Sequence, residues 1–178
     1  MLLYLMRHGI AQDRDDPEAP PDPDRQLTRK GAQRTREVAR GLAALGVDPG
    51  AVLSSPYLRA VSSAQIAAHE LGYSEDDVAQ TDSLLPDCDP AHLFRELAGI
   101  AAGEVLCVGH APSLDEICAY ALGGGRGPLT RLKKAGVACV TIDDVAQPRG
   151  TLLWLLEPGM LRSLGAASKG RRRHKAKR

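Results

Sequence analysis

Two arginines and two histidines of this chain each follow a short apolar run. The four residues are Arg7, His8, Arg59 and His110. The runs cover residues 2–6, 51–53 and 104–109, each the length of one buried strand. In an open α/β sheet, ligands bind at the carboxyl ends of the strands. We therefore expect these four side chains to meet in one pocket.

Such a pocket would be strongly electropositive, which suits chemistry on a phosphoryl group. Guanidinium groups hold phosphoryl oxygens in a bidentate manner, and the start of the helix that carries Arg59 would add partial positive charge. A neutral imidazole can attack phosphorus and form a phosphohistidine, which splits a difficult displacement into two steps. Neighbouring cations would keep His8 unprotonated and would stabilise the oxygens of the transferring group.

The elements that must position these residues alternate between strand and helix patterns, which predicts an α/β layered sheet. We expect strands at 2–6, 51–53, 78–80, 104–109, 136–142 and 151–156, and helices at 28–45, 56–71, 90–100 and 112–122. Thr28 and Asp89 are suited to cap two of these helices. A hairpin-like turn at 143–150 predicts that the last two strands are antiparallel. The proline-rich stretch 12–26 is expected to be a loop that lines the site.

Composition narrows the class of protein. The chain has 178 residues, which fits one domain, and 43% of them are hydrophobic. Each apolar run is too short for a membrane span, and Arg7 interrupts the first one. The four cysteines are widely spaced, so the sequence gives little support for disulfides or a zinc site. We expect a cytoplasmic protein with reduced thiols and no membrane contact.

The C-terminal stretch has a different charge from the rest. Residues 168–178 contain seven Lys or Arg and no acid, whereas acids outnumber bases in the remainder. A basic tail on an acidic body is typical of a disordered arm. We therefore predict a folded domain at 1–160 and a basic, disordered tail at 161–178. Acidic surfaces and nucleic acid are the candidate partners of that tail.

Four short motifs together resemble a known family. They are Met6-Arg7-His8-Gly9, Leu27-Thr28-x-x-Gly31, Ser55-Pro56-x-x-Arg59-Ala60 and Val108-Gly109-His110. Their order and spacing are similar to the histidine phosphatase, or phosphoglycerate mutase-like, superfamily, over residues 1–157. Three features resemble the small SixA-type phosphohistidine phosphatases of this superfamily. They are the short chain, the segment Leu84-Leu85-Pro86-Asp87, and Lys134-Ala135-Gly136, which leads into the penultimate strand.

The resemblance implies a fold and a set of roles. The fold would be a three-layer α/β/α domain, its central sheet mostly parallel with one antiparallel strand. His8 would be the nucleophile, its other ring nitrogen oriented by a backbone carbonyl. Arg7, Arg59 and His110 would bind the phosphoryl oxygens, and Gln12 is a further candidate for phosphate binding. No metal or other cofactor would be required.

The general acid is where the sequence departs from the larger relatives. The candidates for a proton donor are Asp87 and Asp89, and Asp89 is better explained as a helix cap. An alkoxide needs a donated proton to leave, whereas imidazole leaves far more easily. A weak donor therefore favours phosphohistidine in a protein as the substrate.

Two other functions stay open on the sequence alone. The same chemistry could serve a small phosphate ester, such as a sugar phosphate or a nucleotide. A non-catalytic module could instead use the phosphate pocket or the basic tail to bind a partner. The complete set of His8, Arg7, Arg59 and His110 favours an enzyme, because a binder needs no nucleophile. Mutase activity is disfavoured, since no inserted lid is evident.

Overall fold

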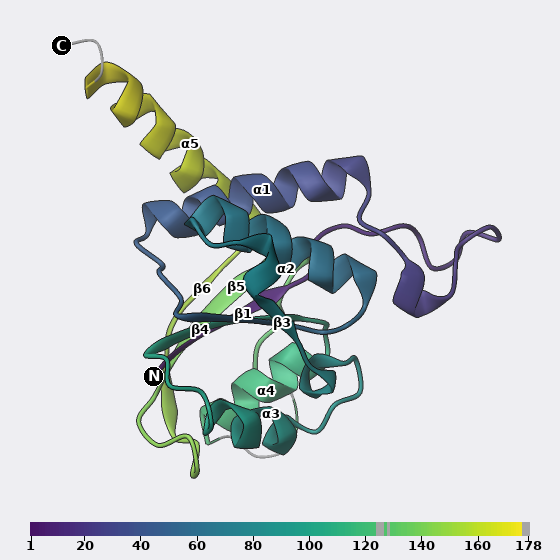
Figure 1. Cartoon of the computed structure of the whole chain (residues 1–178), viewed down its shortest axis with the longest axis vertical. Coiled ribbons are helices and arrows are strands. Elements are labelled where there is room, and N and C mark those ends of the chain that lie inside the picture. The colour runs from purple at the N-terminus through teal and green to yellow at the C-terminus, as the bar shows by residue number, and fades with distance from the viewer. Residues whose placement is uncertain (124–126, 128, 176–178) are drawn as a thin grey trace.

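A six-stranded mixed sheet lies at the centre of the protein, as Figure 1 shows for the computed structural model. The structure describes residues 1–123, 127 and 129–175, with residues 169–175 described by their backbone. The strands are β1 (Leu2–Arg7), β2 (Ala51–Ser54), β3 (Val78–Gln80), β4 (Glu104–Gly109), β5 (Val137–Ile142) and β6 (Gly150–Leu156). Their order in the sheet is β3-β2-β4-β1-β5-β6.

The direction of the strands confirms the predicted sheet. β1, β2, β3 and β4 pair in parallel, while β5 is antiparallel to both β1 and β6. The register aligns the strand ends, because Arg7 lies opposite Gly109 and Ser54 lies opposite Val108. The residues that follow β1, β2 and β4 therefore emerge at one edge of the sheet.

In the described part of the chain, helices cover both faces of this sheet, and the last of them packs against α1 and then extends away from the sheet (Figure 1). They are α1 (Arg29–Ala44), α2 (Leu58–Leu71), α3 (Pro90–Leu97), α4 (Ser113–Ala121) and α5 (Pro158–Lys175). The predicted caps are confirmed: the Thr28 side chain accepts a hydrogen bond from the Gly31 amide, and Asp89 accepts one from the Ala91 amide. Gly72 ends α2 in the left-handed conformation that glycine adopts without strain.

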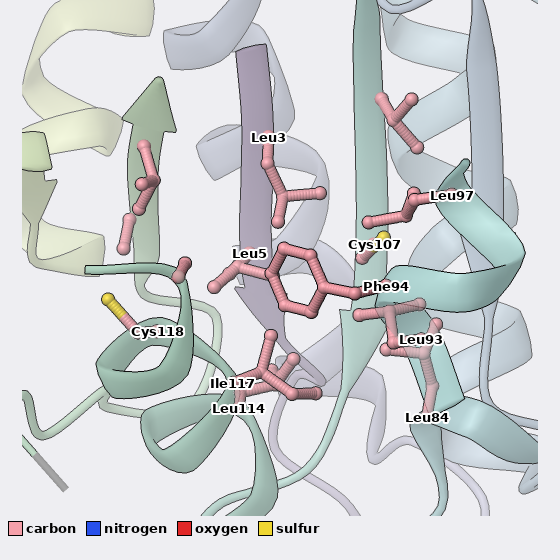
Figure 2. Close-up of a cluster of buried hydrophobic side chains, with 14 of the residues drawn as sticks. Leu3, Leu5, Leu84, Leu93, Phe94, Leu97, Cys107, Leu114, Ile117 and Cys118 are labelled. Atoms are coloured by element: carbon pink, nitrogen blue, oxygen red, sulfur yellow. The ribbon is translucent and has the colours of Figure 1, made fainter. Parts of the chain in front are cut away.

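Each face of the sheet has its own buried apolar layer. Figure 2 shows the layer between the sheet and α3 and α4, where Leu5, Phe94 and Ile117 come from three different elements. The opposite layer joins the sheet to α1, α2 and α5, and Val38 and Leu161 are fully buried in it. The two layers make the three-layer α/β/α architecture that the resemblance implied.

The C-terminal segment differs from the prediction. Residues 161–175, expected to be disordered, continue the helix α5, and its first turns pack against α1. Leu161 is fully buried, and a Cβ on Gly41 would come within 2.1 Å of the Leu161 carbonyl oxygen. This close helix contact outweighs the basic composition that suggested disorder, so the domain extends past residue 160. The side chains of residues 169–178, on which the predicted tail contacts depend, lie outside the described residues.

The structure gives the state of the cysteines and the character of the helices. All four cysteines are free; Cys107, Cys118 and Cys139 are buried and Cys88 is half-buried. None of the helices in the described part of the chain combines the length and the apolar character needed to cross a membrane.

Candidate active site

The aligned strand ends bring three of the predicted residues into contact. His8, Arg59 and His110 are each at least nine-tenths buried, and the two imidazole rings lie with centroids 5.1 Å apart. The Arg59 Nε lies 3.3 Å from Nε2 of His8. His8 follows β1, Arg59 stands in the first turn of α2, and His110 follows β4. The fold thus places these three predicted residues next to one another.

The hydrogen bonds of His8 define which ring nitrogen is free to react. Its Nδ1 lies 2.7 Å from the carbonyl oxygen of Gly9, which can only accept a hydrogen bond. Nδ1 therefore carries the proton, and Nε2 presents its lone pair toward the N–H of Arg59. This is the orientation by a backbone carbonyl that the resemblance implied for His8.

The surroundings of His8 also keep it neutral. Burial lowers the pKa of His8 to about 3, with further lowering by His110 and by the guanidinium groups of Arg59 and Arg7. The hydrogen bond to Gly9 opposes this shift but does not cancel it. At neutral pH the ring is uncharged, and Nε2 keeps the lone pair that a nucleophile needs.

His110 is held by a serine that the sequence reasoning missed. Its Nε2 lies 2.8 Å from Oγ of Ser55, and this hydroxyl also accepts a bond from the Tyr57 amide. Burial lowers the pKa of His110 to about 3, so the ring is neutral as well. If the Ser55 hydroxyl donates to Nε2, the proton of His110 sits on Nδ1. That Nδ1 is buried and has no hydrogen-bond partner among the described residues.

Arg7 is fixed by the loop that enters β5. Its Nη1 donates to the Leu132 carbonyl at 2.9 Å, and the Leu132 amide donates to the buried carboxylate of Asp115 at 2.8 Å. Asp115, on α4, thus positions Arg7 through the backbone of Leu132. The Nε of Arg7 is buried and, within the part of the chain that the structure describes, has no partner. Burial lowers the pKa of this guanidinium, with Asp115 opposing the change.

The guanidinium of Arg59 is held by Asp22, a second residue that sequence reasoning missed. Its Nη1 donates to the Asp22 carbonyl at 2.5 Å and its Nη2 to the Asp22 carboxylate at 3.0 Å. Arg25 donates to the same carboxylate at 2.6 Å. Partial burial raises the pKa of Asp22 and is the largest single effect. The hydrogen bonds and charges of Arg25 and Arg59 together outweigh it and lower the pKa to about 2. Asp22 is therefore a fixed anion and a poor proton donor.

Gln12 does not join the cluster. Its side-chain oxygen accepts a hydrogen bond from the Gln26 amide at 2.8 Å, and its backbone carbonyl accepts one from Arg25. The residue is exposed, and none of its hydrogen bonds among the described residues reaches His8 or Arg59. The structure thus gives Gln12 a role in closing the 12–26 loop, and its contact with phosphate stays a prediction.

Small residues allow the loop after His8 to lie close to α1 and α2. The Gly9 amide donates to Ser63 Oγ at 3.0 Å, and a Cβ on Gly9 would come within 2.3 Å of Thr35 Oγ1. Ser63 in turn donates to the Arg59 carbonyl at 2.6 Å. Ser63, one helical turn after Arg59, therefore links the backbone of Gly9, the residue after His8, to the backbone of Arg59.

Neither predicted donor touches the cluster through a hydrogen bond within the described chain. Asp89 caps α3, as expected, which accounts for its carboxylate. Asp87 is exposed and lines a groove of about 700 Å³ together with Tyr57. Tyr57 packs edge-on against His110, with ring centroids 5.2 Å apart. Asp87 and Tyr57 therefore line the same groove, and of these two residues Tyr57 contacts His110.

The assembled residues place two arginines and His110 around the unprotonated Nε2 of His8. Two of its nitrogens, Arg7 Nε and His110 Nδ1, are buried without a partner in the described chain, and buried polar groups in native proteins are nearly always hydrogen-bonded. A tetrahedral oxyanion at His8 Nε2 would supply acceptors for the N–H of Arg7 Nε and, in the tautomer that carries its proton there, for His110 Nδ1. The described residues contain no group of three or more His, Cys, Asp or Glu side chains spaced to hold a metal ion.

This chain is similar to proteins of the histidine phosphatase superfamily in both sequence and fold. The model of the histidine phosphatase superfamily (branch 1) matches residues 3–85, which carry His8 and Arg59. The solved structure of the protein histidine phosphatase SixA in complex with tungstate superposes with a TM-score of 0.77 and 26% identity, covering 90% of this chain and 99% of that one. The chain belongs to the histidine phosphatase superfamily.

Two curated relatives match this chain over most of its length. An uncharacterized protein of Picosynechococcus is 43% identical over 141 residues, covering 77% of this chain and 82% of the relative. The phosphohistidine phosphatase SixA of Escherichia coli is 26% identical over 165 residues, covering 89% and 94%. Members of the superfamily are phosphatases, and the predicted family and fold are confirmed.

Proposed function

We propose that this protein is a phosphatase that works through a covalent phosphohistidine on His8. The observation that carries the proposal is the hydrogen-bonding of His8: Nδ1 is committed to the Gly9 carbonyl, and Nε2 is left with a lone pair beside Arg59. Burial and nearby cations keep the ring neutral at physiological pH. Arg7, Arg59 and His110 surround the place where a phosphoryl group would bind.

The reaction would proceed in two displacements at phosphorus. In the first, the lone pair of His8 Nε2 forms a bond to phosphorus while the bond to the leaving group breaks. In the second, water attacks phosphorus, the bond to Nε2 breaks, and inorganic phosphate leaves with the neutral ring restored. Arg7 and Arg59 stabilise the equatorial oxygens in both steps, and His110 Nδ1–H donates a further hydrogen bond.

The substrate we propose is phosphohistidine in a protein. Two relatives described as SixA act on phosphohistidine by name, and one of them was solved with tungstate, a tetrahedral oxyanion. The carboxylate nearest to Arg59, that of Asp22, has a pKa of about 2 and cannot supply a proton at neutral pH. An imidazole leaving group has little need of such a donor.

A small phosphate ester is the second candidate, and one observation favours it. Asp87 shares a groove with Tyr57, whose ring contacts His110. A phosphate ester whose alcohol portion extends into that groove would bring its leaving oxygen near the carboxyl group of Asp87. In that case Asp87 would be the donor. A partner-binding role without turnover is the remaining alternative.

We also propose that catalysis needs no metal and occurs in the cytoplasm. Arg7 and Arg59 supply the positive charge that a metal would otherwise provide at phosphorus. The free cysteines are consistent with a reducing compartment.

Phosphate release tests these alternatives directly. The purified protein, treated with chelator, is assayed with a phosphohistidine-carrying protein and with a panel of sugar phosphates and nucleotides. We expect release from phosphohistidine, no loss of rate with chelator, and competitive inhibition by tungstate. Efficient release from esters, reduced by Asp87→Asn, would shift the assignment to the small-molecule phosphatase. No release from any substrate would indicate the binding module.

A further inference from the structure

A second basic cavity adjoins the proposed phosphoryl site. It has a volume of about 670 Å³ and lies between the first turns of α1, the loop 131–135 and the start of α5. Arg7 lines this cavity and is also one of the residues around His8. The Ala135 amide donates to the carbonyl oxygens of both Arg7 and His8, at 3.0 and 3.1 Å. The cavity wall is therefore bonded to the strand end that carries the nucleophile.

Positive charge dominates the lining of this cavity. Its cationic residues are Arg7, Arg34, Arg131, Lys133, Lys134 and Arg162, and its acid is Glu157. Glu157 is paired with Lys133 at 2.7 Å, and Arg162 is paired with Glu37 at 2.5 Å. Across the described residues, Arg34, Arg131 and Lys134 have no carboxylate within ion-pair distance. The cavity thus keeps an excess of cations that the protein's own acids do not neutralise.

The loop that carries two of these cations is held in place. Asp115 accepts hydrogen bonds from the Leu132 amide and from the Thr130 hydroxyl, at 2.8 and 2.9 Å. Leu132 is itself buried, with 1% of its surface exposed. Arg131 and Lys134 therefore project from a fixed backbone on either side of it, which limits the entropy lost when they bind an anion.

We propose that this cavity binds carboxylates of an acidic protein segment that flanks the phosphohistidine of the substrate. The proposal rests on the proposed function and names the kind of phosphoprotein that the site selects. The cations come from four separate segments around a wide cavity, which suits several dispersed carboxylates better than one compact phosphate. Arg7 joins the two sites, so both can be occupied by one substrate chain.

A pair of phosphohistidine peptides tests the selection. They have the same length, and the residues around the phosphohistidine are Asp and Glu in one and Asn and Gln in the other. We expect wild-type kcat/KM to be about tenfold higher for the acidic peptide, and the difference to shrink with added salt. In Arg131→Gln/Lys134→Gln we expect the ratio to fall to near one, with the neutral peptide hydrolysed within about twofold of the wild-type rate.

Arg149→Gln is the matched control, because Arg149 is an exposed arginine in the β5–β6 turn, at the end of the sheet away from His8. It should retain the preference for the acidic peptide. Equal kcat/KM for the two peptides with wild type, or an unchanged ratio in the double variant, would overturn the proposal. Preference for a sugar bisphosphate over the acidic peptide, lost in the same double variant, would overturn it in favour of a small ligand.

A binding measurement separates this proposal from the proposed function. The unphosphorylated acidic peptide is titrated into wild type and into Arg131→Gln/Lys134→Gln by calorimetry. We expect binding to wild type and about tenfold weaker binding to the double variant, whether or not either phosphopeptide is hydrolysed. If the acidic peptide binds no better than the neutral one, the cavity proposal fails even when phosphatase activity is present.

Discussion

His8 has one ring nitrogen bonded to a carbonyl and the other beside an arginine, and both contacts arise from its place at the end of β1. The carbonyl belongs to the next residue, Gly9, and the arginine begins α2. A histidine on a solvated surface would choose between two tautomers, whereas here the Gly9 carbonyl selects one. The tautomer of this residue and the free lone pair on Nε2 thus follow from its backbone surroundings as much as from the imidazole itself.

Kinetics can separate two effects of Asp22, which are its negative charge and its hydrogen bond with Arg59. Asp22→Ala removes a fixed negative charge and one hydrogen bond from Arg59. We expect inorganic phosphate to inhibit this variant about threefold more tightly, since an anion near the binding site is lost. We expect kcat to fall roughly tenfold, since Arg59 is less well oriented for the transition state. Steady-state kinetics with phosphate as inhibitor measures both changes.

Asp24→Ala provides the control for this pair of effects. Asp24 is an exposed acid of the same short 3-10 turn, Asp22–Asp24, and forms none of the ion pairs found within the described residues. It should leave kcat and phosphate inhibition near the wild-type values. If the two variants behave alike, Asp22 has no particular role in positioning Arg59.

At the scale of elements, the loop after β1 and the first turn of α1 need a glycine to approach each other. A Cβ on Gly31 would lie 1.9 Å from the Ile10 carbonyl oxygen, a distance that requires the backbone to move. Gly31→Ala should therefore lower the free energy of unfolding by at least about 2 kcal/mol, as overpacking against backbone does. Denaturant unfolding followed by circular dichroism measures the change.

Gly103→Ala is the comparison for that variant. A Cβ at Gly103 would meet no heavy atom within 4 Å, and its backbone is not in the left-handed region. Its free energy of unfolding should stay within about 0.5 kcal/mol of wild type. Equal stability of the two variants would show that the contact between Gly31 and Ile10 is not tight in solution.

For the whole molecule, the two buried histidines predict a loss of stability in acid. The pKa values of His8 and His110 are lowered to about 3, mainly by burial, while in the unfolded chain they return to about 6.5. Between these values the unfolded state binds protons that the folded state does not. Stability is therefore fully present above pH 6.5 and falls as the pH is lowered toward 3.

The slope of this change is the measurable quantity. Each histidine contributes up to about 1.4 kcal/mol per pH unit within that window, and Asp22 adds to the loss only below about pH 4. Denaturant unfolding from pH 7.5 to 4.5 should show a smaller loss for His8→Asn/His110→Asn than for wild type. The same pH dependence in both proteins would mean that these histidines titrate normally in the folded state.

The sequence predicted the sheet and most of the cluster because the relevant signals are local. An apolar run followed by Arg7 and His8 marks a strand end, and the same pattern recurs before His110. The parallel register then brings these ends together without further information. The caps at Thr28 and Asp89 are equally local and were also predicted correctly.

What the sequence could not supply depends on contacts between distant segments. The 12–26 loop contains several aspartates, and nothing near Asp22 distinguishes it from Asp24 until the loop folds back onto α2. The packing of α5 depends on Leu161 and Gly165 meeting α1, a contact that the basic composition of the segment obscured. The hydrogen bond by which the Gln12 side chain closes the loop is likewise not evident from the sequence.

The most direct test of the account is to look for the phosphorylated form of His8. Wild-type protein is mixed with a phosphohistidine peptide labelled in its phosphoryl group, quenched in alkali within one turnover, and digested for mass spectrometry. The account predicts a phosphoryl group on the peptide that contains His8, and its absence, together with loss of turnover, in His8→Asn. Turnover by wild type with no label on His8, or continued turnover by His8→Asn, would contradict it.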